Sequence, residues 1–361
     1  MLVTRLWLAD FRSYERLELD LSTGLTAIAG PNGVGKTNLL EAIGLLATLK
    51  SFRGAPVDSL VRRGAPAAVV RAEGVRDDRD VLIELELSRG RTRAQVNRQR
   101  LRRARDLLGA LRVTVFAPDD LALVKEGPSR RREFLDDVLV ALDPGADRVV
   151  GEVERTLRQR NALLRQAHGR LDAAGAMTLD VWDSKLAQAG QELTERRERL
   201  VAELVPMVGE SYEILAGRRS DVAATYQRSW AQITLAEALA EGRRDDVRRG
   251  VSQAGPHRDE LAVTLDGLAS RTEASQGEQR TLALALRLSG HRLVTERLGE
   301  APLLLLDDVL SELDPNRAAA LLANLPPGQS IITTASGLPP APGGGELADR
   351  VLAFTAPGVL A

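Results

Sequence analysis

One eight-residue stretch, Gly30-Pro31-Asn32-Gly33-Val34-Gly35-Lys36-Thr37, constrains the fold of this chain more than any other feature. It matches the phosphate-binding loop pattern G-x-x-x-x-G-K-[ST] at every fixed position. The apolar run 25–29 before it is typical of a buried strand, and residues 37–49 after it are typical of a helix. A strand, a glycine loop and a helix in this order aim backbone N–H groups at an anion. The sequence therefore predicts an α/β fold that binds a nucleoside triphosphate at this loop.

The residue types of the loop suit contact with phosphates. Gly33 and Gly35 allow backbone conformations that are closed to residues with a Cβ atom. Lys36 is placed to reach the β- and γ-phosphates, and the Thr37 hydroxyl is placed to ligate Mg²⁺. We therefore expect a nucleoside triphosphate with Mg²⁺ at this loop. The candidate nucleotide-binding residues of this stretch are Gly30, Pro31, Asn32, Gly33, Val34, Gly35, Lys36, Thr37 and Asn38.

Composition excludes several other classes of protein. The chain has 361 residues, 44% hydrophobic and 27% charged, which is typical of a globular protein with two lobes. No apolar run approaches the roughly 20 residues of a membrane span. The first residues lack the basic and apolar regions of a signal peptide, so we expect a cytoplasmic protein without membrane contact. The absence of cysteine and the three scattered histidines argue against disulfides and against thiolate or histidine metal centres.

The formal net charge of -1 means that any nucleic-acid contact must come from local basic patches. Two arginine clusters are candidates, at residues 98–105 and 130–132. For residues 98–105 the alternative is a solvated helix face. Only four of the 49 basic residues are lysines, so abundant arginine is a property of the whole chain and weakens both candidates.

The pattern along the chain predicts one lobe interrupted by a second. Short alternating runs typical of strands dominate residues 3–29 and 68–116. Residues 128–249 are charged and mostly helical, with glutamate and arginine four residues apart in 191–204, which stabilises exposed helices. A helix of about 40 residues from Leu179 would extend roughly 60 Å. We expect an ATP-binding lobe formed by 1–127 and 250–361, and an inserted helical arm at 128–249.

Ser275-Gln276-Gly277-Glu278-Gln279-Arg280 precedes an apolar helix. Ser275 and Glu278 have the S-x-x-E spacing of a capping box, so a helix should begin here. Its N-terminus, with Gly277 allowing close approach, offers a second anion site. The motif alone also fits a plain helix cap.

An apolar run at 303–306 ends in Asp307 and Asp308, and Ser311-Glu312-Leu313-Asp314 follows. Asp307 is the natural holder of Mg²⁺, and Asp308 is placed to orient or deprotonate an attacking water. The buried run 330–334 should bring Thr334 towards the γ-phosphate. Either aspartate can instead cap the next helix.

Together these motifs resemble the head of ABC-type ATPases, in which the signature of one subunit closes over the nucleotide of the other. Further segments narrow the resemblance to the RecF family of DNA replication and repair proteins. They are Phe11-Arg12-Ser13-Tyr14, 30–38, 116–120, 131–136, 255–260, 275–280 and 305–314.

The resemblance spans about residues 2–355 and implies a mixed α/β ABC-type ATPase head with an inserted helical arm. It implies a bacterial, weak ATPase that dimerises with ATP on single- or double-stranded, gapped DNA. It further implies partners of the RecO and RecR type, and loading of the RecA recombinase at single-strand gaps. The implied catalytic residues are Asp308, Asp307 and Lys36, and Thr37 and Asp307 are the implied Mg²⁺ ligands. The nucleotide site would be completed by Arg12, Ser275, Gln276, Gly277, Glu278 and Thr334.

Three departures from the wider superfamily affect the expected activity. Asp308 replaces the usual catalytic glutamate and is one methylene shorter, and Thr334 replaces the switch histidine. No clear Q-loop glutamine occurs near 116–120. The RecF pattern has the same aspartate pair and threonine, so the departures do not weaken the resemblance. Because the water-activating carboxylate is poorly placed, we expect slow hydrolysis that times a switch.

Some alternatives remain open at this stage. The Phe11–Tyr14 turn can pack on adenine, touch a phosphate or only staple a hairpin. A transporter ATPase fits less well, because of the signature and Thr334, and a Rad50-like head needs a far longer arm. The sequence does not separate a slow ATPase from a non-catalytic adaptor that uses ATP only to dimerise.

Overall fold

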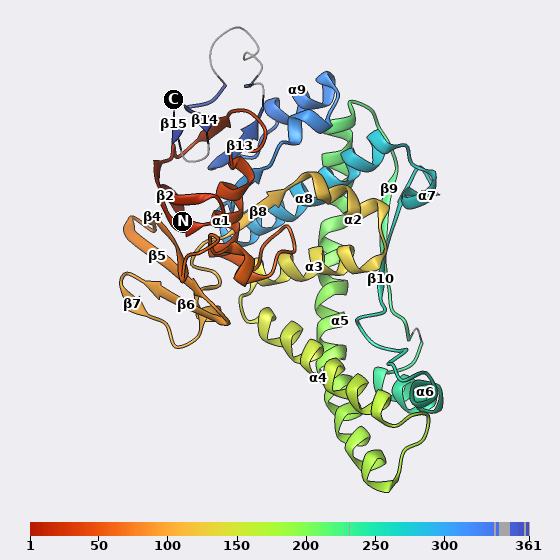
Figure 1. Ribbon diagram of the computed structural model, residues 1–361. Coiled ribbons are helices and arrows are strands. Elements are labelled where there is room, and N and C mark those ends of the chain that lie inside the picture. The colour runs from red at the N-terminus through yellow and green to blue at the C-terminus, as the bar shows by residue number, and fades with distance from the viewer. Residues whose placement is uncertain (231, 336, 339–346, 357–358, 361) are drawn as a thin grey trace. The chain divides into compact units, whose positions relative to one another are not determined.

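The computed structural model describes residues 1–230, 232–335, 337–338, 347–356 and 359–360 (Figure 1). They form two compact units. The first comprises Met1–Leu121, Ser211–Arg219 and Gln276–Ala361, and the second comprises Ala122–Glu210 and Ser220–Ser275. These bounds differ from the expected ones, which placed the helical arm at 128–249. The main difference lies at 250–275, where strand β10 (Glu260–Leu265) pairs with β9 (Val222–Gln227) and so joins the helical unit.

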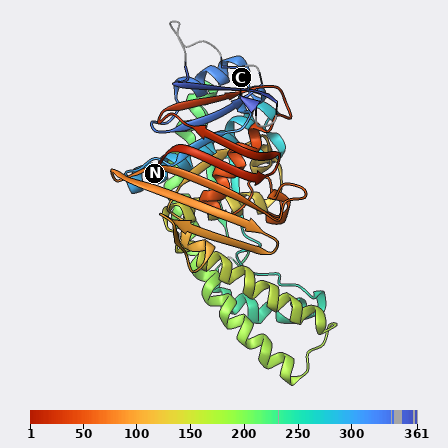
Figure 2. The same cartoon turned by 60° about the vertical axis from the view of Figure 1, so that its left-hand side comes forward.

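An antiparallel sheet of six strands, in the order β2-β1-β4-β5-β6-β7, opens the first unit. Its red and orange strands lie side by side in Figure 2. Burial alternates along them as the period of a strand requires, with Ala68, Val70 and Ala72 buried between less buried neighbours. The strands are β1 (Leu2–Phe11), β2 (Tyr14–Asp20), β4 (Ala67–Arg76), β5 (Arg79–Ser88), β6 (Arg91–Val96) and β7 (Gln99–Arg100).

A second sheet of six strands, in the order β15-β14-β3-β13-β12-β8, positions the candidate site. All its neighbours pair in parallel except β14 and β15. Since β3, β13 and β12 are adjacent and parallel, their carboxyl ends meet at one edge of the sheet. The strands are β3 (Leu25–Ala29), β8 (Val113–Phe116), β12 (Leu303–Leu306), β13 (Ser330–Thr334), β14 (Arg350–Ala356) and β15 (Val359–Leu360).

Helix α1 (Lys36–Thr48) is the central helix of the first unit. Leu39 and Ile43 of α1 share one hydrophobic core with Leu6 of the antiparallel sheet and with Leu305 and Ile331 of the parallel sheet. This core fixes the loop before α1 relative to β12 and β13. The other helices of the unit are η1 (Val57–Leu60), η2 (Ala104–Leu107), η3 (Pro118–Leu121), α8 (Gln276–Leu298), η4 (Val309–Glu312) and α9 (Pro315–Ala323).

The second unit is mostly helical, as the sequence predicts. Its main element is α5 (Ala173–Ala216), a helix of 44 residues with Pro206 inside it, and its last residues belong to the first unit. A small sheet in the order β11-β10-β9 includes β9, which interrupts the helices of this unit. The other elements are α2 (Ala122–Lys125), α3 (Pro128–Leu142), α4 (Ala146–Gln166), α6 (Leu235–Arg249), β11 (Leu268–Ala269) and α7 (Ser270–Glu273).

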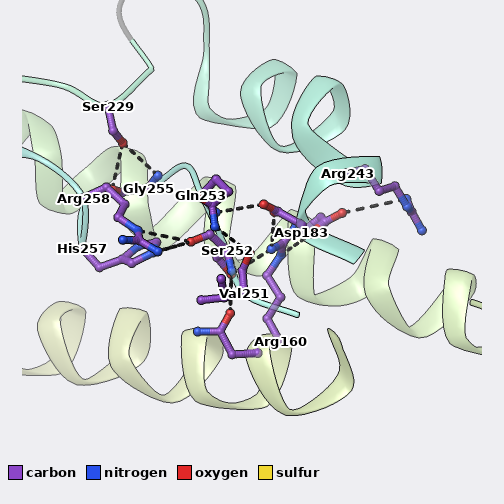
Figure 3. A network of polar contacts seen from close by, with 12 residues as sticks. Arg160, Asp183, Ser229, Arg243, Val251, Ser252, Gln253, Gly255, His257 and Arg258 are labelled. Atoms are coloured by element: carbon purple, nitrogen blue, oxygen red, sulfur yellow. Dashed lines mark hydrogen bonds and ion pairs between the residues drawn. The ribbon is translucent and has the colours of Figure 1, made fainter. Parts of the chain in front are cut away.

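A buried polar network holds the helices of the second unit together (Figure 3). The fully buried Arg160 of α4 donates to Asp183 of α5 at 2.6 Å and to Asp246 of α6 at 2.7 Å. Arg160 also donates to Ser252 Oγ. The backbone carbonyl of Ser252 accepts from Arg258. The Gly255–Glu260 motif therefore follows a loop that is fixed to two helices. Removal of one partner from such a pair leaves an uncompensated buried charge.

Residues 337–345 are rich in proline and glycine, and residues 339–345 lie outside the described part of the chain. Within the described ranges, no helix combines the length and apolar character needed to cross a membrane.

Candidate functional site

The loop between β3 and α1 has the local geometry that its glycines predict. Gly35 precedes α1 in the left-handed region, with φ 102°, and Gly33 has φ 87°. A Cβ atom on Gly35 would lie 2.7 Å from the Tyr14 hydroxyl oxygen, so a side chain is excluded by sterics as well as by φ. The Gly30 N–H donates to the Thr334 carbonyl, which fixes the start of the loop to the end of β13. The loop is thus rigidly set at the N-terminus of α1.

Lys36 begins α1, and its side chain lies across the loop. Its Nζ donates to the carbonyl oxygens of Gly30 at 2.6 Å and Pro31 at 3.0 Å. Pro31, Asn32 and Gly33 are exposed, so the ammonium is held beside the open part of the loop. Val34 is buried and anchors the loop in the core. A cation at the N-terminus of a helix, beside free loop amides, suits a polyphosphate.

The hydroxyl of Thr37 and the carboxylate of Asp307 meet, although 270 residues separate them in the chain. Thr37 Oγ1 donates to Asp307 Oδ1 at 2.9 Å. Thr333 Oγ1 donates to the same oxygen at 2.8 Å. Asp307 comes directly after β12, and its own N–H donates to the Phe116 carbonyl at the end of β8. The ends of β12 and β13 and the start of α1 therefore converge on one carboxylate, and the end of β8 holds its backbone.

Asp308 has an unusual backbone conformation beside this carboxylate. Its φ of 49° and ψ of 26° are left-handed, a region that non-glycine residues enter at a cost. Its N–H donates to Thr333 Oγ1 at 2.9 Å, and its carbonyl accepts from the Ser311 side chain at 2.8 Å. The turn directs the chain from β12 into η4.

The pKa of the Asp307 carboxyl is raised on balance, although opposing effects act on it. Burial raises the pKa of the Asp307 carboxyl above its ordinary value, and the adjacent Asp308 raises it further. The hydrogen bonds from Thr333 and Thr37 and the charge of Arg53 act in the opposite direction. A buried carboxylate supported mainly by hydroxyl donors is ready to accept a cation.

The donor set fits Mg²⁺. Mg²⁺ prefers oxygen ligands and usually combines one or two carboxylates with substrate phosphates. Thr37 and Asp307 supply one hydroxyl and one carboxylate beside the phosphate loop. No group of three His, Cys, Asp or Glu residues suited to a metal occurs in the described part of the chain. A cation here would therefore depend on the nucleotide as well as on the protein.

Arg12 lies in the Phe11–Tyr14 turn, where the structure gives its side chain a protein partner. Its guanidinium donates two hydrogen bonds of 2.7 Å to the fully buried Glu41 of α1. Phe11 and Tyr14 are buried in the core, and the Tyr14 hydroxyl donates to the Gly35 carbonyl at 3.0 Å. Of the three alternatives for this turn, these contacts fit the structural one.

Thr334 is the last residue of β13. Its hydroxyl donates to the Gly337 carbonyl at 3.0 Å. The adjacent Thr333 is the residue that contacts the aspartate pair. The sequence contains both threonines but offers no signal to choose between them.

The signature segment forms the start of α8, as its capping pattern predicts. Ser275 and Gln276 are exposed at this helix N-terminus. Glu278 accepts from Arg218 at 2.8 Å, and a Cβ atom on Gly277 would lie 2.6 Å from Arg317 Nη1. Two arginines from other segments of the first unit, which sequence reasoning missed, thus flank the signature.

One of the two arginine clusters is not a free surface. Arg131 is buried and donates two hydrogen bonds to Glu260, at 2.7 Å and 2.8 Å. Arg132 donates to the Asp259 carbonyl, and Arg130 pairs with Glu133. Arg131 and Arg132 thus support the second unit internally, whereas Arg130 is exposed and forms surface ion pairs. By contrast, Arg98, Arg100, Arg102 and Arg103 are exposed on and after the β6–β7 hairpin.

The sequence is similar to named proteins along nearly its whole length. The profile of the RecF/RecN/SMC N terminal domain matches residues 2–336. The DNA replication and repair protein RecF of Streptomyces avermitilis is 45% identical over 351 residues, covering 93% of this chain and 94% of that protein. The protein of the same name from Frankia alni is also 45% identical, and the match covers 93% of each chain.

Solved structures of similar proteins share the fold of this chain. The structure described as the recombination mediator protein RecF-ATP in the RecFOR pathway is 29% identical, with a TM-score of 0.89, over 99% of this chain and 96% of that chain. The Smc head domain of Pyrococcus furiosus, 17% identical with a TM-score of 0.55 over 99% of this chain and 94% of that chain, shares the fold alone.

The expected mixed α/β ABC-type head is confirmed by these likenesses, with sheets and helices arranged as in RecF and SMC heads. The profile match and the identities of 45% over 93% of the chain are decisive for the family. The chain belongs to the RecF family of DNA replication and repair proteins.

Proposed function

We propose that this chain is an ATP-dependent DNA-binding protein of recombinational repair and replication, and that it hydrolyses ATP slowly. Its relatives carry names of DNA replication and repair, and one solved relative is described with ATP. In this proposal ATP binds in the cytoplasm and closes a homodimer on DNA. Hydrolysis, stimulated by DNA, reopens the dimer.

The single observation that carries the proposal is the convergence of Thr37 and Asp307 beside the phosphate loop. A hydroxyl after the loop lysine, joined to a carboxylate at the end of a neighbouring strand, is the arrangement that holds Mg²⁺ on a nucleoside triphosphate. When bound, Mg²⁺ supplies charge neutralisation on the phosphates. Thr37 and Asp307 would hold it, and Lys36 would bind the β- and γ-phosphates.

Asp308 is the proposed base in the hydrolytic step. Its carboxylate would accept a proton from the attacking water as a bond forms to the γ-phosphorus and the bond to the ADP oxygen breaks. The carboxylate of an aspartate is shorter than that of the glutamate usual in the superfamily. A base with shorter reach supports slow turnover.

The dimer is proposed from the exposed signature. Ser275, Gln276, Gly277 and Glu278 lie at the start of a long helix, where backbone amides favour an anion. In the proposed dimer they contact the nucleotide held by the phosphate loop of the other copy. Arg12 and Thr334 complete the nucleotide site in this proposal. For Arg12 this requires exchange of Glu41 for the nucleotide, because the two are joined by two hydrogen bonds.

Partners are proposed from the relatives alone. A solved relative is described as a recombination mediator in the RecFOR pathway. We therefore propose RecO- and RecR-type proteins as partners and gapped DNA as the nucleic acid to which the chain binds. The proposed outcome is loading of RecA at single-strand gaps.

Phosphate release, measured with and without gapped DNA, tests the proposal directly. The proposal predicts slow release that DNA accelerates. Tight ATP binding with no release above background, with or without DNA, would favour a non-catalytic adaptor that uses ATP only to dimerise. Absence of ATP binding would contradict both.

The exposed arginines of the β6–β7 hairpin are the proposed DNA contact. Asn97 and Arg98 have φ of 49° and 64°, which fits the two-residue turn of a tight hairpin at the edge of the sheet. Replacing Arg98 and Arg100 by glutamine should weaken DNA binding at low salt. Each lost phosphate contact should lower the slope of log affinity against log salt by about 0.9 for duplex DNA.

A matched control uses Arg148 and Arg158 of α4, which are also exposed but are ion-paired with Glu152 and Glu154. Their double replacement removes the same charge and should leave the slope unchanged. Equal effects from both pairs would assign the slope to net charge, and no effect from either would mean that the hairpin is only solvated surface.

A further inference from the structure

Thr333 lies in β13, next to the carboxyl ends of its two neighbours in the parallel sheet, β12 and β3. Leu306 of β12 pairs with Ile332 of β13. The next residues along the two strands, Asp307 and Thr333, therefore lie opposite each other. On its other side Thr333 pairs with Ile28 of β3, the strand that leads into the phosphate loop. The side chain is fully buried. A polar group in such a position needs a partner for its hydroxyl.

The hydroxyl of Thr333 connects the two aspartates. It donates its only proton to Asp307 Oδ1 at 2.8 Å and accepts the Asp308 N–H at 2.9 Å. Thr37 donates to the same carboxylate oxygen, so two hydroxyls from different elements fix the rotation of the Asp307 carboxylate. A single side chain thus sets the orientation of one aspartate and the backbone position of the next.

The second contact has a conformational consequence. Asp308 is left-handed, and residues held in such sparsely populated conformations cost on the order of 1–3 kcal/mol and persist only where their surroundings fix them. The Thr333 hydroxyl supplies one of these fixing contacts. A β-branched residue suits the task, because its χ1 angle is restricted and its hydroxyl keeps one direction.

We propose that Thr333 is a positioning residue of the ATPase site, which orients the Asp307 carboxylate towards the cation and holds Asp308 in place for the attacking water. The proposal rests on the proposed ATPase function and adds a residue to it. Thr333 acts through the two aspartates and needs no contact with nucleotide. Partners of this kind, behind metal ligands, typically contribute about 10–100-fold to metal affinity or activity.

Thr333→Val tests this role, because valine has nearly the same shape and lacks the hydroxyl. Affinity for a fluorescent ATP analogue is measured with Mg²⁺ and with EDTA, together with the rate of phosphate release. The ratio of the two affinities should fall by about 10-fold, and the rate by about 10–100-fold. Affinity in EDTA should remain close to that of the unmodified chain, because Lys36 and the loop are unchanged.

Two variants separate positioning from general structural damage. Thr333→Ser keeps the hydroxyl and should restore both readouts to within about 3-fold. Thr26→Val removes a fully buried hydroxyl from β3, directly across from Ile331, without contact to the aspartates. It should lower the melting temperature as Thr333→Val does, and leave the affinity ratio and the rate unchanged. If Thr333→Val does not fold, Thr333→Ala provides a second variant without the hydroxyl.

The inference is overturned if the valine and alanine variants keep the original affinity ratio and rate, if serine fails to restore them, or if Thr26→Val loses them equally. Each of these outcomes leaves ATP binding and hydrolysis by the unmodified chain intact, so the proposed function stands. An unmodified chain that binds no ATP contradicts the proposed function itself and, with it, the role of Thr333.

Discussion

Lys36→Ala should reduce ATP affinity by about 30-fold or more, since truncating one member of a desolvated charge pair costs at least about 2 kcal/mol. The ammonium of Lys36 is held at the loop by the carbonyls of Gly30 and Pro31. Alanine removes the one loop side chain that can offset phosphate charge. The fold should remain intact, because the glycines and the helix start are unchanged. Titration with a fluorescent ATP analogue measures the effect.

Lys50→Ala is the matched control for this experiment. Lys50 is exposed and lies two residues beyond α1, so its removal takes away the same charge from the same region. The ATP affinity of the Lys50→Ala variant should match that of the unmodified chain. Near-normal affinity of the Lys36 variant, or equal losses in both variants, would contradict the assignment of the loop.

Asp308→Asn should reduce hydrolysis by about 100-fold or more while leaving ATP binding intact, because a general base contributes about 10²–10⁴ to the rate. Asparagine tolerates the left-handed conformation that Asp308 adopts, so the backbone turn and the contact with Thr333 should survive. With hydrolysis blocked, the ATP-bound dimer should persist. Phosphate release measures the first effect and gel filtration with ATP the second.

Asp119→Asn serves as the control, since Asp119 is an exposed aspartate of the same unit. It should hydrolyse ATP at the original rate and show no lasting dimer. If the Asp308 variant elutes only as a monomer with ATP, or turns ATP over normally, Asp308 is not the base.

Local patterns were sufficient to predict the strand, loop and helix around residues 25–48. The glycine spacing and the apolar runs reflect contacts between near neighbours in the chain, so they are legible without the fold. The same holds for β12, which is a run of four leucines before two aspartates, and for β13, which is short and buried throughout. Parallel strands then bring Thr37 and Asp307 together, as the motif order predicts.

Other parts of the site depend on contacts that leave no local mark. All five residues of β13 are buried, so burial does not alternate and cannot tell the face of Thr333 from that of Thr334. Arg12 finds Glu41 in the next helix, and Arg131 finds Glu260 far along the chain. The boundary of the helical unit was missed for the same reason, since it depends on the pairing of β9 with β10.

The central claim is that each ATP is held between the Lys36 loop of one copy and the Ser275 signature of the other. Two linked dimers test it with the same two lesions, Lys36→Ala and Ser275→Arg. In the first dimer each copy carries one lesion, so a shared site leaves one complete site and one with both halves broken. In the second dimer one copy carries both lesions, so each shared site has one broken half.

The measurement is retention of ATP in the closed, linked dimer, compared between the two arrangements. Our account predicts that the dimer with divided lesions retains ATP and that the dimer with both lesions on one copy does not. Sites built within a single chain would reverse this ranking, because the unmodified copy would then keep a complete site. Retention by the second dimer and not by the first would contradict the account.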